Sequence, residues 1–264
     1  MKVSIITVSF NSADTIKDTI KSVIDQDHKN IEHIIIDGGS QDDTLQIINK
    51  YKDKIDLIIS EPDNGIYNAM NKGIMLATGD IIGILNSDDF YIDNGVVSKI
   101  VSAFNSKNVE SVYSDLIYVN SSDLSKGVRL YSSENFAPGL LPYGIMPAHP
   151  TFFVKREIYK KYGVFKEDYK ILADFELIVR FLYVNRVSYY YMKGITVKMR
   201  VGGISTSWKS LVTNNIEMVK ACRENGIRTN YLKISYRYWS KMLSLLVRFN
   251  RNYTTHEVSR EDNR

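Results

Sequence analysis

The chain of 264 residues contains very little cysteine and no regular histidine pattern. Its one cysteine, Cys222, excludes an intramolecular disulfide framework and a thiolate metal cluster. The four histidines are scattered and lack the spacing of a zinc site. No uninterrupted apolar run approaches the ~20 residues that a helix needs to cross a bilayer. These absences argue against disulfide-stapled, zinc-dependent and membrane-spanning proteins.

The remaining composition is typical of a globular protein, with 44% hydrophobic and 24% charged residues. The length suits one extended domain or two closely fused ones. The first residues enter a strand pattern at once, which leaves no room for a signal peptide and predicts a cytoplasmic protein. Charge is uneven, because residues 220–264 contain ten Lys or Arg and four Asp or Glu, a net +6 within a chain total of +4.

Strand and helix patterns alternate along the first half of the chain. Strands are expected at residues 3–9, 31–36, 55–59 and 81–85, with helices at about 14–24, 42–51 and 65–77 between them. This alternation predicts an α/β fold with a mostly parallel sheet flanked by helices.

After Ser114 the pattern weakens. We expect a loop over 131–143, strands at 151–154, 187–191 and 196–201, and helices at 156–162 and 174–184.

The end of the chain, residues 232–249, is amphipathic. Its apolar stripe is Leu232, Tyr236, Trp239, Leu243 and Leu246, with Lys233, Arg237, Lys241 and Arg248 roughly opposite. A terminal helix docked on the core and a helix lying in the headgroup region of an anionic membrane fit this pattern equally well.

Two adjacent carboxylates, Asp88 and Asp89, directly follow the apolar strand at 81–85. Strand C-terminal ends bind ligands in α/β proteins, and Mg²⁺ or Mn²⁺ prefers carboxylate oxygens and often holds diphosphates. An ordinary polar turn explains residues 86–89 as well. Polar clusters also end the first two strands, at 9–11 and 37–40, so one composite site at one sheet edge is expected.

The order and spacing of these segments resemble glycosyltransferase family 2, the inverting nucleotide-sugar transferases with the GT-A (Rossmann-like) fold. The resemblance covers about residues 3–205. The segments that carry it are TVSFN at 7–11, DGGSQD at 37–42, SEPDNG at 60–65, ATGD at 77–80, NSDD at 86–89, ADFEL at 173–177 and RVGGIS at 200–205.

For the donor, the resemblance implies that Thr7, Ser9, Asn11 and Asp37 line the nucleoside pocket. Asp37 suits a ribose hydroxyl or a base N–H, although a cap or turn is the alternative. Asp63 either lines the same pocket or completes a turn.

The same resemblance assigns Asp88 to a Mn²⁺ or Mg²⁺ ion that neutralises charge on the departing nucleoside diphosphate. Asn86 replaces the first acid of the family's Asp-x-Asp motif, so it contributes no charge but can bind a ribose or phosphate. Asp89 is expected to orient the site. Arg200 is expected to contact the diphosphate, with a surface arginine as the alternative.

Asp174 corresponds to the catalytic base, which deprotonates the attacking hydroxyl; a helix N-cap is the alternative. Glu176 is a weaker candidate. His149 either orients the acceptor hydroxyl or is structural.

The implied organisation is a nucleotide-sugar half at 1–115, an acceptor and base half at 116–228 of the same domain, and a basic amphipathic helical tail at 229–264. The expected reaction moves a hexose or N-acetylhexosamine from a UDP-sugar to a polyprenyl-diphosphate-linked saccharide in O-antigen or exopolysaccharide synthesis.

The tail would bind the inner face of the cytoplasmic membrane, and no nucleic acid is expected as a partner. The alternatives are a nucleotidyltransferase, which the lack of a glycine-rich basic loop after the first strand disfavours, and a non-catalytic carbohydrate-binding protein on a degenerate fold.

Overall fold

The computed structural model describes residues 1–201 and 208–238. Its first half alternates strands and helices as predicted. In chain order these are β1 (Val3–Ser9), α1 (Ile16–Ile24), β2 (Ile31–Asp37), α2 (Thr44–Asn49), a 3-10 turn (Lys52–Lys54), β3 (Leu57–Ser60), α3 (Ile66–Leu76) and β4 (Ile81–Ile84). The four strands pair in parallel in the order β3-β2-β1-β4.

The second half adds antiparallel pairings, so the sheet as a whole is mixed. Its strands are β5 (Asp89–Tyr91), β6 (Ser111–Asn120), β7 (Asp123–Tyr131), β8 (Phe153–Lys155) and β9 (Tyr189–Arg200). The short strand β8 runs antiparallel to both β4 and β6 and thereby joins the two halves in one sheet. β9 lies parallel to β6 and antiparallel to β5, and β7 pairs with β6.

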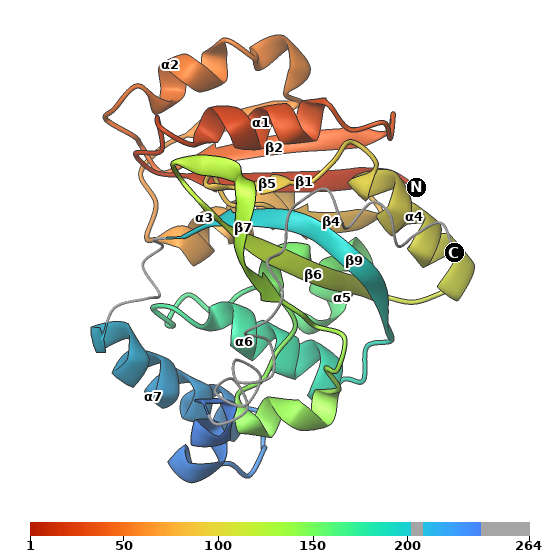
Figure 1. Ribbon diagram of the computed structural model, residues 1–264, viewed down its shortest axis with the longest axis vertical. Coiled ribbons are helices and arrows are strands. Elements are labelled where there is room, and N and C mark those ends of the chain that lie inside the picture. The colour runs from red at the N-terminus through yellow and green to blue at the C-terminus, as the bar shows by residue number, and fades with distance from the viewer. Residues whose placement is uncertain (202–207, 239–264) are drawn as a thin grey trace.

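The sheet is buried between two layers of helices because its central strands are apolar on both faces. All residues of β1 are buried, and alternate side chains face opposite sides of the sheet: Ile5 packs with α4 (Val96–Lys107) and Ile6 with α3. Helices α1, α2 and α4 cover one face. Helices α3, α5 (Arg156–Tyr162) and α6 (Ala173–Ile178) cover the other, and α7 (Trp208–Glu224) packs outside α6 (Figure 1).

Several second-half elements differ from the sequence prediction. The two strands expected at 187–191 and 196–201 are one continuous strand, β9. The helix expected over 174–184 is α6 followed by a π-helical turn at Val179–Val184. The loop expected at 131–143 includes the end of β7 and a 3-10 turn at Pro138–Tyr143. The hairpin β6–β7 and the helices α4 and α7 were not predicted.

The C-terminal segment packs on the core with a face other than the predicted stripe. Residues 231–238 are helical. Ile234 and Arg237 are buried, and the Arg237 guanidinium donates to Asn215 of α7 at 3.0 Å. Two members of the predicted stripe are exposed: Leu232 is 82% exposed, and Tyr236 is 51% exposed while one edge of its ring packs against Tyr143, with ring centroids 5.7 Å apart. The rest of the stripe, from Trp239 onward, lies outside the described residues.

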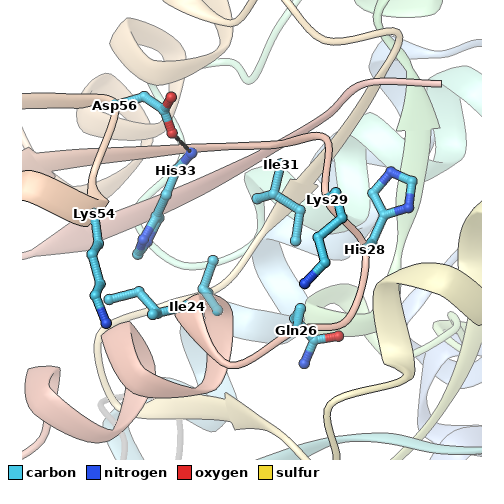
Figure 2. A pocket seen from close by; sticks show the side chains of 9 residues that line it. Ile24, Gln26, His28, Lys29, Ile31, His33, Lys54 and Asp56 are labelled. Carbon is cyan, nitrogen blue, oxygen red and sulfur yellow. Dashed lines mark hydrogen bonds between the residues drawn. The ribbon is translucent and has the colours of Figure 1, made fainter.

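A cavity of about 340 Å³ opens at the N-terminal end of β2, away from the strand ends that carry Asp37 and Asp88. Figure 2 shows Lys54 and His33 on one side of it and Lys29 and His28 on the other. Burial lowers the pKa of His33 to about 3, so this histidine is neutral. Across the described ranges, no helix is long and apolar enough to span a bilayer.

Candidate active site

The loops after β1, β2 and β4 are joined by hydrogen bonds at one edge of the sheet. The Asn11 N–H donates to Ser40 Oγ at 2.8 Å, and Asn11 Oδ1 accepts the Gln41 N–H at 2.9 Å. The Ser12 and Ser87 hydroxyls lie 2.8 Å apart and share a hydrogen bond. The polar clusters that the sequence placed at three strand ends therefore form one continuous surface.

Asp37 organises this surface from within. Its side chain is 0% exposed. Its two carboxylate oxygens accept hydrogen bonds from the hydroxyls of Ser9, Ser40 and Ser60 and from the N–H groups of Gly39 and Ser40, at 2.5–3.1 Å. These bonds use the lone pairs of the carboxylate, so Asp37 shapes the loop and would reach a nucleoside only by breaking them.

Asp63 is the carboxylate that lies over this loop. Its Oδ1 accepts the Gly65 N–H at 2.8 Å. Its Oδ2 lies only 2.6 Å from the position that a Cβ on Gly38 would occupy. A Cβ at position 38 would therefore displace the end of the Asp63 side chain, and Gly39, at φ +80°, lets the loop turn beneath it. Through Oδ1, Asp63 makes the hydrogen bond expected of a turn aspartate. Its Oδ2 has no hydrogen-bond partner among the described residues.

Thr7 and Ser9 are buried, and their hydroxyls bond to other buried side chains. The Thr7 hydroxyl is buried and lies 3.1 Å from His33 Nε2. Ser9 is buried and donates to Asp37 at 3.0 Å. Of the three donor-binding residues predicted in this segment, only Asn11 is exposed, and it adopts a left-handed backbone with φ 48°.

The turn at residues 86–89 contains buried side-chain oxygens that accept no hydrogen bond from the described residues. Asn86 Oδ1 and Asp89 Oδ1 are buried and have no hydrogen-bond partner in the described part of the chain. Burial raises the pKa of Asp88, an effect that Arg200 opposes. Burial and then the Asp88 charge raise the pKa of Asp89 well above its usual value. Orphaned oxygens beside two carboxylates are the donor set of a hard divalent cation, so the residues fit Mg²⁺ or Mn²⁺.

Arg200, at the end of β9, holds this turn in place. Its guanidinium donates to the Asp88 carbonyl at 2.7 Å, forms an ion pair with Asp18 of α1, and lies 5.0 Å from the Phe90 ring centroid. The side chain is buried, so it is not the surface arginine that was the alternative. The glycine-rich segment that follows it, residues 202–205, lies outside the described residues.

Strand direction brings His149 to the same edge. The 3-10 turn His149–Thr151 directly precedes β8, and β8 runs antiparallel to β4. The start of β8 therefore lies where β4 ends, beside residues 86–89. Burial lowers the pKa of His149, whereas the nearby Asp174 charge raises it.

Asp174 lies at the second position of α6, close enough to His149 for the two charges to interact. Its Oδ1 accepts the Phe175 N–H at 2.8 Å. Burial raises the pKa of Asp174, which His149 and the Phe175 N–H lower and Glu217 raises. The carboxylate is thus a stronger base than an exposed aspartate.

Glu176 points into a different network. It is fully buried and pairs with Arg180 at 2.9 Å and Lys166 at 3.1 Å. Burial alone would raise the pKa of Glu176, but the bonds from Arg180 and Asn225 outweigh it and lower the pKa. The segment before Asp174 is contacted by two side chains that the sequence did not single out, Tyr67 and Glu217.

The mixed sheet, whose parallel strands end in loops with unpaired acceptors, has the architecture of the GT-A class of α/β transferases. The family model described as "Glycosyl transferase family 2" matches residues 4–163. The chain belongs to glycosyltransferase family 2 and is a glycosyltransferase.

An uncharacterized glycosyltransferase of Mycobacterium tuberculosis is 35% identical over 181 residues, 67% of this chain and 68% of that protein. S. aureus TarS (residues 1–349, with UDP-GlcNAc) superposes with a TM-score of 0.69 at 16% identity, over 95% of this chain and 76% of that one. This chain spans 65% of the TarS chain solved with UDP.

The mannosyltransferase PcManGT from Pyrobaculum calidifontis, solved with GDP-Man and Mn²⁺, has a TM-score of 0.61 at 16% identity, over 83% of this chain and 64% of that one. At these identities the two solved structures establish the shared fold alone.

Proposed function

We propose that the protein is an inverting glycosyltransferase that moves a hexose or N-acetylhexosamine from a UDP-sugar to a saccharide on a lipid diphosphate. The observation that carries this proposal is the shared sheet edge: because β8 is antiparallel to β4, the 149–151 turn lies at the end of β4 that leads into the 86–89 turn. The complexes of TarS with UDP-GlcNAc and of PcManGT with GDP-Man support a nucleotide-sugar donor.

The donor would lie across the loops that follow β1, β2 and β3. Asn11 is exposed there, and the Asp63 Oδ2 atom is available to accept a hydrogen bond from a base N–H or a ribose hydroxyl. Asp37, Ser9 and Thr7 would act indirectly, by fixing the loop on which the nucleoside rests.

The diphosphate would lie at residues 86–89. Asp88, with Asn86, would hold Mn²⁺ or Mg²⁺, and the bound cation would neutralise charge on the departing nucleoside diphosphate. No group of three His, Cys, Asp or Glu in the described residues could hold a metal. The donor phosphates and water would complete its coordination, as is usual for Mg²⁺. Arg200 fixes the turn through the Asp88 carbonyl and adds positive charge beside it.

Asp174 would accept the proton of the acceptor hydroxyl. The oxygen of the acceptor hydroxyl then forms a bond to the anomeric carbon of the sugar, as the bond from that carbon to the nucleoside diphosphate breaks on the opposite face. Because burial raises the pKa of Asp174, the carboxylate accepts this proton more readily than an ordinary aspartate. His149 would lie beside the acceptor hydroxyl and orient it.

In this scheme the first half of the domain, residues 1–115, binds the donor and the second half, 116–228, binds the acceptor and carries the base. A lipid-linked acceptor is favoured by the outward stripe at Leu232 and Tyr236, next to the exposed cations Arg228 and Lys233. Such a surface suits the anionic inner face of a cytoplasmic membrane.

The proposed function is tested by the stereochemistry of transfer. Wild-type protein is incubated with a panel of nucleotide sugars and a synthetic N-acetylglucosamine-diphosphate lipid, with MnCl₂ or with EDTA. We expect a UDP-sugar to be used, EDTA to abolish transfer, and proton NMR of the product to show a β-linkage from an α-linked donor. An α-linked product would disprove inversion. Full activity in EDTA would show that transfer does not require a divalent cation.

A further inference from the structure

The segment immediately before Asp174 is held by a carboxylate from a distant helix. Glu217 of α7 is buried, and its two oxygens accept three successive backbone N–H groups, from Lys170 at 2.7 Å, Ile171 at 3.0 Å and Leu172 at 2.9 Å. The structure shows no ion pair from Glu217 to a lysine or arginine within the described ranges. Its buried charge is therefore compensated by this segment, which leads directly into α6.

A second helix grips the same segment from another direction. The Tyr67 hydroxyl of α3 donates to the Ile171 carbonyl, so the Ile171 peptide unit is held on both sides. Asn71, also on α3, exchanges hydrogen bonds with the backbone of Phe165 at 2.9 and 3.0 Å. Helix α3 begins just after the loop that carries Asp63, which links the donor loop mechanically to the segment before the base.

We infer that Glu217 is a positioning residue for catalysis: it fixes residues 170–172 so that Asp174 faces the acceptor hydroxyl. This inference rests on the proposed role of Asp174. Only Ala173 separates Asp174 from the last clamped N–H, that of Leu172, so a shift of this segment would move the carboxylate directly. Displacement of a reacting group by about 1 Å can cost about 100-fold in rate.

Glu217 also acts on Asp174 through its charge. The titratable groups that interact with Asp174 are His149 before β8, Tyr67 on α3, Tyr131 on β7 and Glu217 on α7. Among them Glu217 is the other carboxylate, and its negative charge raises the pKa of Asp174. Removal of that charge should lower the pKa of Asp174 and move the acid limb of the kcat profile to lower pH.

The test compares Glu217→Gln with Glu224→Gln, a matched variant on the same helix whose carboxylate contacts the side chains of Lys166 and Tyr169 instead of the 170–172 backbone. We expect Glu217→Gln to lower kcat by about 10- to 100-fold, to leave the KM for the donor unchanged, and to shift the acid limb downward. Glu224→Gln should retain the wild-type kcat and pH profile.

A folded Glu217→Gln protein with wild-type kcat and acid limb overturns the inference. If that variant does not fold, Tyr67→Phe decides, since it removes one hydroxyl from the Ile171 carbonyl: a lower kcat at unchanged donor KM supports the clamp, and an unchanged kcat refutes it. An inactive Asp174→Asn beside a normal Glu217→Gln refutes only this inference, whereas an active Asp174→Asn refutes the proposed function itself.

Discussion

At the scale of single residues, the most informative contrast is between Asp37 and Asp63. Asp37 was expected in the nucleoside pocket, and Asp63 either there or in a turn. Asp37 is buried and accepts five hydrogen bonds from its own neighbourhood. Asp63 lies over Gly38 with one oxygen still available. The sequence located both acids but could not distinguish them, because the distinction depends on serines contributed by three separate loops.

Asp37→Asn should therefore act mainly on stability. An amide at this position keeps one acceptor and turns an NH₂ group toward hydroxyl and N–H donors, leaving several buried donors without partners. We expect a loss of about 3 kcal/mol in the free energy of unfolding, measured in urea.

Asp53→Asn is the matched control, because Asp53 is an exposed aspartate in the 3-10 turn before β3. Its stability should stay within about 0.5 kcal/mol of wild type. An Asp37→Asn protein as stable as this control would show that the carboxylate does not organise the loop.

At the scale of elements, the first half of the chain was predictable and much of the second half was not. Strands such as 81–85 and helices such as 65–77 agree with the structure to within a few residues, because apolar runs alternate there with amphipathic segments. β7 is mostly exposed, and Lys126 interrupts the apolar face formed by Leu124, Val128 and Leu130, so its strand periodicity is weak. Its identity as a strand comes from pairing with β6.

The helix at residues 231–238 shows how tertiary packing overrides a helical pattern. The pattern placed Leu232 and Tyr236 on one apolar face and Arg237 roughly opposite. The structure buries Arg237 and Ile234 against α7 and the loop at Gly144, and leaves Leu232 and Tyr236 exposed. Periodicity alone would have assigned Leu232 and Tyr236 to the core and Arg237 to the solvent-facing side.

The double variant Leu232→Glu/Tyr236→Glu tests the membrane role of this stripe. Wild-type protein should float with vesicles that contain phosphatidylglycerol, whereas the variant should bind them at least about tenfold more weakly, because two apolar side chains no longer enter the headgroup region. Vesicle flotation measures the difference.

Met75→Glu provides the matched control, since Met75 on α3 is similarly exposed outside the stripe. These substitutions test membrane binding more specifically than removal of the residues after Thr229 would, because residues 231–238 also pack on the core and their removal would disturb the fold. Equal flotation of the double variant and wild type, or an equal loss in Met75→Glu, would end the membrane proposal.

At the scale of the whole molecule, the site depends on one sheet built from both halves of the chain. The sequence predicted that strand-end acids would meet, and it named Asp88, Asp174 and His149. It could not supply the antiparallel β8 that brings the second half to the edge, because three residues, Phe153–Lys155, carry too little pattern to fix a strand direction. Glu217 was likewise beyond reach, since α7 was not predicted.

The central claim, that one edge of this sheet binds the donor while Asp174 acts as the base, is tested most directly by Asp174→Asn. The amide preserves the shape of the side chain and removes its basicity. Asp168→Asn, an exposed aspartate six residues earlier, serves as the control. We predict that Asp174→Asn lowers kcat by at least about 1000-fold while calorimetry shows unchanged UDP affinity, and that Asp168→Asn keeps normal kcat. Transfer by Asp174→Asn at near the wild-type rate would contradict the account.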